Sequence, residues 1–389
     1  MQSEFVFSSE SVTRGHPDKV CDQISDRIVA GYLQVDPDAQ VVAEAALSTG
    51  IVFNSVRFAS RVAVDTASLV REAIADAGYV EGRFNARTCT VMSSLIEHPP
   101  TQVAPSSLLG GTDADIDRLV ATEQTTAFGF ACDHTPELMP LPISLANKLA
   151  RRLDTVRQEG ILPYLTPDGK AQVTIEFKNR RPHRVFGVIV NSGQRKESER
   201  PAGQLERDIR EQVIERVFAE EPIRIDGNTK IYTSGGGKGG PYAHAGLTGR
   251  KGGTDTYGDY ARRTDSALSG KDPTRVERIG SYAARYAAKH VVAAGLAAQC
   301  EVQLSYSVGL PGPVSVQVET YGTGRIGEDD IAQRLRSTFD FRVAALLKRF
   351  RLHDLDPELV YPRLATYGHM GRMDLNLPWE ALDHVDAMR

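Results

Sequence analysis

The sequence is short of cysteine and tryptophan. Its 389 residues include only four cysteines and one tryptophan. The cysteines are Cys21, Cys89, Cys132 and Cys300. They are widely scattered, with no CxxC pair and no histidine nearby at the spacing of zinc ligands. This distribution excludes a disulfide-stapled scaffold and argues against a structural zinc site, so we expect reduced, mostly buried thiols.

Long hydrophobic runs and a surplus of positive charge are also missing. No segment is apolar over the length of a bilayer, and the N-terminus MQSEFVFSSESV has no basic segment followed by an apolar stretch of signal length. Lys and Arg number 46 against 50 Asp and Glu, a formal net charge of −4, which offers no electrostatic footprint for nucleic acid. We expect a cytoplasmic protein that binds neither nucleic acid nor a membrane.

The length predicts two or three domains. Short β-branched runs predict strands, and apolar residues at helical spacing predict helices. The expected strands are 40–47, 88–96, 171–177, 184–190, 300–308 and 314–321, and the expected helices are 17–34, 66–78, 144–158, 203–217, 279–298 and 329–349. Because hairpins and helices are mixed, we expect an α+β fold with helices on one face of each sheet.

Two stretches rich in glycine, proline or serine mark candidate seams, at 99–113 and 233–253. The first is either a mobile lid or a plain linker, and the sequence leaves both open. The seams divide the chain into an N-terminal α/β subdomain (1–103), a central subdomain (114–236) and a C-terminal subdomain (237–389).

The stretch ESVTRGHPDKVCDQISD, residues 10–26, predicts the start of an amphipathic helix. Apolar residues recur every four positions on one face, and Asp18, Asp22 and Asp26 recur on another. Pro17 suits the first helical position, beyond which free amides attract anions. The stretch is therefore either a site for a metal-phosphate ligand, with His16 and Asp18 taking part, or an ordinary helix cap with His16 on the surface.

Positive charge gathers among glycines in GLTGRK (246–251) and SGKDPTRVER (269–278). The cations are Arg250, Lys251, Lys271, Arg275 and Arg278. Neither segment is a P-loop, since GxxxxGK[ST] is absent. Glycines let backbone amides approach an anion and the cations supply counter-charge, so a polyphosphate is one ligand that fits; a solvated basic loop is the other reading.

These motifs occur with LTPDGKAQV (165–173), DTYG (255–258), SYAARYAAKHVVAAGLA (281–297) and YGHMGR (367–372). Together they resemble the S-adenosylmethionine synthetase family, in order, from about residue 4 to 380. The resemblance implies three similar α/β subdomains around a pseudo-threefold axis, and a homodimer or dimer of dimers with active sites between subunits. In the family reaction, methionine sulfur attacks the 5′ carbon of ATP and expels triphosphate, which is then hydrolysed to pyrophosphate and phosphate.

The resemblance also implies roles for single residues. Because the leaving group is a polyanion, catalysis depends on cations fixed where its charge develops. Asp18 matches a magnesium ligand and Glu44 the carboxylate of a potassium site. His16, Lys170, Arg250 and Lys271 are the expected catalytic residues. The expected ATP and triphosphate ligands are these four together with Glu10, Glu123, Asp168, Lys251 and Arg275.

Some positions depart from the family pattern while keeping charge. The second magnesium carboxylate, an Asp in the family, is Glu277 here, and the neighbouring Lys is Arg275. The family's Gly-Asp-Gln-Gly stretch is Thr-Glu-Gln-Thr at 122–125, which removes the glycines that allow close approach to the nucleoside.

The implied acceptor pocket departs further. Arg57 stands where the family has a Glu, and His244 where it has an Asp, both of which hold the methionine ammonium. His98 falls near a Gln that orients methionine, and Arg275 completes the expected pocket. A contact ion pair near a surface is worth about 4 kcal/mol before screening. If about 1–2 kcal/mol per site remains, the two changes weaken methionine binding by one to three orders of magnitude.

Several functions therefore stay open. The first is an ATP-dependent adenosyltransferase whose acceptor carries an extra anionic group, paired with Arg57, Arg275 and His244, or is water. The second is an ordinary synthetase in which Arg57 has turned to solvent after a register shift and another acid holds the ammonium. The third, from a different class, is a silent nucleotide-binding paralogue, against which the retained phosphate-binding cations argue.

Overall fold

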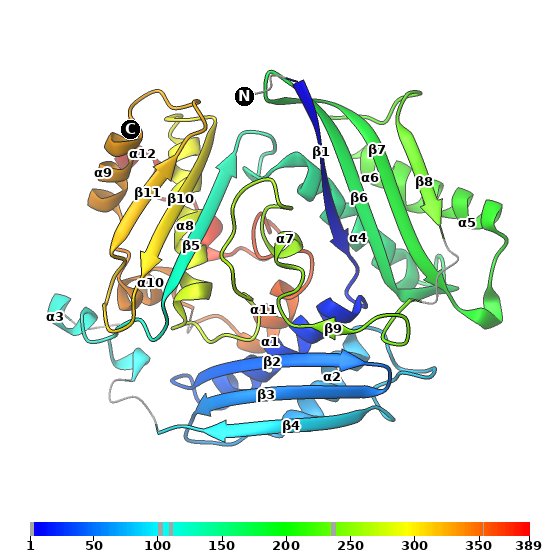
Figure 1. Ribbon diagram of the computed structural model, residues 1–389, viewed down its shortest axis with the longest axis horizontal. Helices are drawn as coiled ribbons and strands as arrows, with labels where there is room; N and C mark the ends of the chain where they lie inside the picture. Colours follow the sequence, from blue (N-terminus) through cyan, green and yellow to red (C-terminus); the bar gives the residue numbers. More distant parts are fainter. Residues whose placement is uncertain (1–3, 100–103, 109–111, 235–238, 353) are drawn as a thin grey trace.

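The computed structural model describes residues 4–99, 104–108, 112–234, 239–352 and 354–389. Three β-sheets surround the middle of the molecule (Figure 1). Sheet I has the strand order β1-β6-β7-β8, sheet II has β11-β10-β5, and sheet III has β4-β3-β2-β9. Parts of both expected seams, 100–103, 109–111 and 235–238, lie outside the described residues, so the choice between a lid and a linker at 99–113 stays open.

The described strands and helices have the following bounds. The strands are β1 (Glu4–Val12), β2 (Gln40–Ser48), β3 (Ile51–Ala59), β4 (Thr90–Glu97), β5 (Thr125–Cys132), β6 (Leu165–Lys178), β7 (Arg181–Gln194), β8 (Lys230–Ser234), β9 (Gly246–Leu247), β10 (Gln299–Tyr306) and β11 (Ser315–Glu319). The helices are α1 (Pro17–Val35), α2 (Thr66–Asp76), α3 (Asp113–Ile116), α4 (Leu141–Gln158), α5 (Ala202–Ile209), α6 (Glu215–Ala219), α7 (Gly252–Asp255), α8 (Val276–Ala293), α9 (Glu328–Thr338), α10 (Val343–Phe350), α11 (Pro357–Leu364) and α12 (Val385–Met388).

Each sheet is covered by helices, which confirms the expected α+β class. Helix α4 packs on sheet I, α8 on sheet II, and α1 with α2 on sheet III. Buried apolar side chains of sheet I and α4 form one core, and those of sheets II and III with α1 and α8 form a second. None of the described helices combines the length and apolar character needed to span a bilayer. All four cysteines are free and buried, as expected.

The expected helix over 329–349 is wrong, because the chain breaks it into α9 and α10. Phe339 is extended, and it and Phe341 are both buried, an alternation that belongs to extended chain. Asp340 accepts a hydrogen bond from the backbone N–H of Arg342 at 3.0 Å and so starts the next helix. The expected helix over 203–217 is also interrupted, by one π-helical turn at Arg210–Ile214.

Each sheet contains strands from distant parts of the chain. The first strand, β1, pairs antiparallel with β6 of sheet I. Strand β5 pairs antiparallel with β10 of sheet II, and the short β9 pairs with β2 of sheet III. The three parts of the chain are therefore joined by main-chain hydrogen bonds, and the glycine-rich segments lie where the parts meet.

A row of aspartates on α1 holds two of those segments. Asp18 accepts a hydrogen bond from Leu247 N at 3.0 Å and Asp22 one from Gly249 N at 2.7 Å. One turn further on, Asp26 accepts from Gly270 N at 2.8 Å. The carboxylates that the sequence places on one helix face are thus used mainly to bind backbone amides of 246–251 and 269–278.

Two buried cations complete this aspartate row. Lys19 donates to Asp22 at 2.8 Å and to Asp255 at 2.5 Å, and it is fully buried. Arg278 donates to Asp26 at 2.7 Å. Burial alone would lower the pKa of Arg278, but the Asp26 charge raises it above its usual value. Arg278, which the sequence grouped with possible phosphate-binding cations, is therefore a buried structural residue.

We predict that Asp26→Asn will lower the free energy of unfolding by about 3–5 kcal/mol, because it leaves the Arg278 guanidinium buried without its counter-ion. The measurement is the urea midpoint of unfolding. A matched control is Asp386→Asn, which removes the acid of the exposed Arg389–Asp386 pair and should cost less than about 1 kcal/mol. Equal midpoints for the two variants would contradict the structural role of Asp26.

Candidate active site

The residues predicted for the site fall into two groups. One, which we call the His16 cluster, gathers around the start of α1, and the other lines a pocket beside Arg57. The His16 cluster comprises Glu10, His16, Asp18, Asp168, Lys170, His244, Arg250 and Lys251. The Arg57 pocket is lined by Glu44, Arg57, His98, Glu123, Lys271, Arg275 and Glu277, among others.

His16 both caps α1 and belongs to the site. Its Nδ1 accepts a hydrogen bond from Asp18 N at 3.2 Å, and Pro17 takes the first helical position, as the sequence predicts. The preceding Gly15 carbonyl accepts a hydrogen bond from the Tyr79 hydroxyl at 2.5 Å. The His16 side chain is not on the surface, because the residue is only 9% exposed. The capping alternative is thus right about the cap and wrong about exposure.

The position of the His16 ring keeps it uncharged. Burial is the main cause that lowers its pKa, to about 2, and the charges of Lys251, His244 and Lys170 act in the same direction. A neutral imidazole can donate or accept a hydrogen bond, but it adds no fixed positive charge. The fixed charge of the cluster must come from lysine and arginine.

Three of the cluster's cations are held by carboxylates. Lys170 and Lys251 both bind Glu10, Lys251 at 3.1 Å. Burial would raise the pKa of Glu10, but hydrogen bonds from the two lysines lower it below its usual value. Arg250 lies 3.4 Å from Asp18. Burial raises the pKa of Asp18 despite its hydrogen bond from the Leu247 amide.

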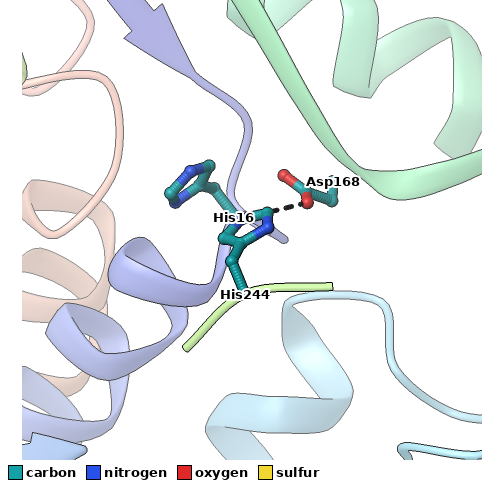
Figure 2. A group of neighbouring side chains, drawn as sticks. All are labelled: His16, Asp168 and His244. Carbon is teal, nitrogen blue, oxygen red and sulfur yellow. Dashed lines mark ion pairs between the residues drawn. The ribbon is translucent and has the colours of Figure 1, made fainter. Parts of the chain in front are cut away.

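Asp168 and His244 face each other across the same cluster (Figure 2). Asp168 Oδ2 lies 3.5 Å from His244 Nε2 and accepts a hydrogen bond from Gly240 N at 2.6 Å. The centroids of the His244 and His16 rings are 4.9 Å apart. His244 therefore lies with the phosphate-binding candidates, whereas the sequence grouped it with Arg57 and His98.

The Arg57 pocket has a volume of about 580 Å³. Arg57 lies directly opposite Val42 in the regular pairing of β3 with β2, and it is an exposed residue on the wall of this pocket. The Arg57 side chain makes no hydrogen bond or ion pair with the described residues. Lys271 also lines this pocket, and its backbone forms an isolated antiparallel β-bridge with Val42 on the edge of β2 away from β3. Burial lowers the pKa of Lys271, opposed by the charges of Glu277 and Glu44.

Arg275, in contrast to Arg57, is already paired. It donates to Glu123 and to the Thr122 hydroxyl, each at 3.1 Å, and lies 3.5 Å from Asp272. The Thr-Glu-Gln-Thr stretch that replaces the family's glycines thus supplies Glu123 to the pocket and Thr122 to Arg275. Glu277 keeps one oxygen, Oε2, buried without a hydrogen-bond partner.

The two groups lie at different points along β2. Lys271 bridges to Val42, whereas β9, which leads to Arg250 and Lys251, pairs with Ala46 and Leu47. Four strand residues correspond to about 13 Å. Within the described part of the chain, no hydrogen bond or ion pair joins the His16 cluster to the Arg57 pocket. The residues predicted for one site therefore form two half-sites in a single chain.

Sequence reasoning missed the residues that support the half-sites. These are Lys19, Tyr79 and Asp255, together with the amide-binding role of Asp22 and Asp26. The four-residue spacing of the aspartates was visible in the sequence, but their partners lie more than 200 residues away. No local pattern identifies such partners.

Comparisons with known proteins agree with this architecture. The N-terminal, central and C-terminal domains described for S-adenosylmethionine synthetase match residues 4–100, 118–238 and 238–381. The S-adenosylmethionine synthases of Synechococcus sp. strain JA-3-3Ab and Thermosynechococcus vestitus are 45% and 42% identical to the chain. These alignments cover 99% and 98% of the chain, and 97% and 96% of the relatives.

The fold and the matches define a three-domain α+β transferase, an ATP-dependent adenosyltransferase. The chain belongs to the S-adenosylmethionine synthetase family.

The glycine at the start of β9 generates a testable prediction. A Cβ at position 246 would lie 2.1 Å from the carbonyl oxygen of Pro17, so Gly246→Ala must push β9 away from the first turn of α1. We expect a loss of about 1–3 kcal/mol of stability and weaker ATP binding, measured by thermal melting and calorimetric titration. Gly227→Ala is the matched control, because nothing lies within 4 Å of its added methyl group. Similar behaviour of the two variants would contradict this close approach.

Proposed function

We propose that the protein is an S-adenosylmethionine synthase that joins the sulfur of L-methionine to the 5′ carbon of ATP. The observation that carries the proposal is that the cations matched to the family's triphosphate ligands gather in the two half-sites of a chain 42–45% identical to curated synthases over nearly its whole length. Triphosphate leaves and is hydrolysed to pyrophosphate and phosphate before release.

In this proposal the protein's cations hold the triphosphate and offset the charge that develops on it. Lys170, Lys251 and Arg250 come from the His16 cluster, and Lys271 comes from the Arg57 pocket. The two lysines are pre-positioned by Glu10. Cations fixed in this way reorganise little during the reaction and therefore stabilise the transition state effectively. Neutral His16 donates or accepts a hydrogen bond near the reacting end of the triphosphate.

A complete site requires a second copy of the chain. The outer face of sheet III carries exposed apolar side chains, namely Ile51, Phe53, Met92, Ile96 and Leu247. Arg57 and Glu44 lie at one end of the same face. Pairing two copies through this face covers its apolar surface and brings the His16 cluster of one chain toward the Arg57 pocket of the other. We therefore propose a homodimer, or a dimer of dimers, with active sites between subunits.

The carboxylates fit the metals expected for the family. The buried, unpartnered Oε2 of Glu277 is available as a magnesium ligand, and Asp18 would supply a second carboxylate from the other half-site. Magnesium bound there would neutralise triphosphate charge and orient the leaving group. Glu44 is an exposed carboxylate on the wall of the Arg57 pocket and would hold potassium.

The cytoplasmic location also stays a prediction.

The pocket still offers acids for the methionine ammonium. Glu44, Glu123 and Glu277 line the same cavity as Arg57. Glu123 is paired with Arg275, Glu277 is the proposed magnesium ligand and Glu44 is the proposed potassium ligand, so the ammonium would share a carboxylate with one of these cations. Methionine therefore remains the acceptor that the identity to known synthases favours.

One observation favours a second candidate function, transfer to a different acceptor. Arg57 lines the pocket at the position where the resemblance places an acid, and it is not neutralised by a described neighbour. A free guanidinium matches a carboxylate or phosphate. The second candidate is thus an adenosyltransferase whose acceptor, such as a thioether, carries an additional anionic group.

Turnover by the Lys271→Ala variant tests the phosphate assignment. Removing this cation should lower kcat at least about 100-fold, because transition-state charge loses a fixed partner. Product formation and phosphate release are the readouts. Lys348→Ala, on the exposed side of α10, is the control and should act as the wild type. Undiminished turnover by Lys271→Ala would overturn the assignment.

A panel of acceptors separates the two candidates. The protein is incubated with ATP, Mg²⁺ and K⁺, with methionine, with no acceptor, or with anionic thioethers, and nucleoside products are followed by mass spectrometry. We expect S-adenosylmethionine from the wild type. Little product with methionine, but a new adenosylated mass with an anionic thioether, would favour the second candidate. In that case the double change Arg57→Glu, His244→Asp should improve methionine use by about 10- to 1,000-fold.

A further inference from the structure

Three potential metal ligands meet beside the start of α1 (Figure 2). His16 comes from the α1 cap, Asp168 from β6, and His244 from the segment before β9. One nitrogen of each histidine and one carboxylate oxygen of Asp168 all lie within 4.8 Å of one another. Among the described residues, no other set of three histidine, cysteine or acidic side chains forms such a group.

We propose that His16, Asp168 and His244 form a site for a divalent transition-metal ion of the zinc class. Two imidazoles and one carboxylate are a ligand set that suits Zn²⁺, Ni²⁺ or Co²⁺, whereas Mg²⁺ prefers oxygen ligands alone. The site is therefore chemically different from the proposed magnesium site at Asp18 and Glu277. Three protein ligands leave at least one coordination position open.

The observed distances need only a small closure. Metal bonds of about 2.1 Å at tetrahedral angles place ligand atoms about 3.4 Å apart. His244 Nε2 and Asp168 Oδ2 are already 3.5 Å apart. Asp168 is anchored by Gly240 N and His16 is fixed by the start of α1, while the His244 side chain is 43% exposed and has room to turn.

The groups around the site determine its affinity for a metal ion. If His16 binds metal through Nδ1, it gives up the long 3.2 Å hydrogen bond from Asp18 N. Lys251, Lys170 and Arg250 repel a dication, although each is paired with Glu10 or Asp18. We therefore expect binding weaker than that of closed structural zinc sites, which carry four ligands.

The site depends on the residue at position 244. With an acid there, as the family pattern has, the group would hold a single imidazole and lose its preference for transition metals. Histidine at this position supplies the second imidazole. A metal held here would be bound to the His16 ring, the same ring that is proposed to contact triphosphate.

The test is a Co²⁺ titration of the full, untagged chain after chelator treatment, without ATP and with Mg²⁺ in excess. Visible absorption reports Co²⁺ bound to nitrogen and oxygen ligands, and added Zn²⁺ should displace it. We expect one Co²⁺ per chain, with binding at least about tenfold weaker in His244→Asp. His183→Ala removes an exposed histidine of β7 and should bind as the wild type.

Unchanged Co²⁺ binding in His244→Asp, or loss of all binding in excess Mg²⁺, would overturn the proposal. A second variant, Asp168→Asn, guards against misfolding of the first, and equal melting temperatures show that each variant is folded. Because the titration contains no ATP, its outcome is independent of whether the adenosyltransferase assignment holds.

Discussion

The row of carboxylates on α1 is the constraint on which the rest of the structure depends. Asp18, Asp22 and Asp26 each accept a hydrogen bond from a backbone amide that lies more than 200 residues away in the sequence. Charge-assisted bonds of this kind are strong and directional, and a buried carboxylate left without them would be costly. The helix thereby fixes β9 and the segment 269–278 relative to each other, and with them the cations of both half-sites.

This arrangement explains how so many charged side chains can lie close together around α1. The cations closest to the aspartate row, Lys19 and Arg278, are buried and neutralised within the scaffold. Lys251 and Arg250 are paired less closely and stay partly exposed, so in the proposed function they would exchange a protein carboxylate for a phosphate oxygen. The ion pairs thus become more exposed with distance from the buried side of this helix face.

The sequence allowed the α+β class and most helices to be predicted, because helix periodicity is a local signal, while the roles that the motifs indicate for single site residues stay predictions. It did not reveal that Arg278 is structural or that His244 lies with Asp168, because both depend on long-range packing. The break between α9 and α10 was missed because apolar residues continue across it at four-residue spacing, as in Leu335, Phe339 and Val343, and this spacing predicts one unbroken helix. Strands β1, β3, β5, β8 and β9 were overlooked because short apolar runs carry little information without their partners.

The pairing of strands that lie far apart in the sequence has a consequence for how the protein folds during synthesis. As the chain leaves the ribosome, β1 must wait more than 150 residues for β6, and β5 must wait still longer for β10. Contacts so distant in sequence are slow to form, and unpaired strand edges invite aggregation meanwhile. Completion of sheets I and II is therefore a late event in synthesis, and a chain truncated before β10 lacks the central strand of sheet II.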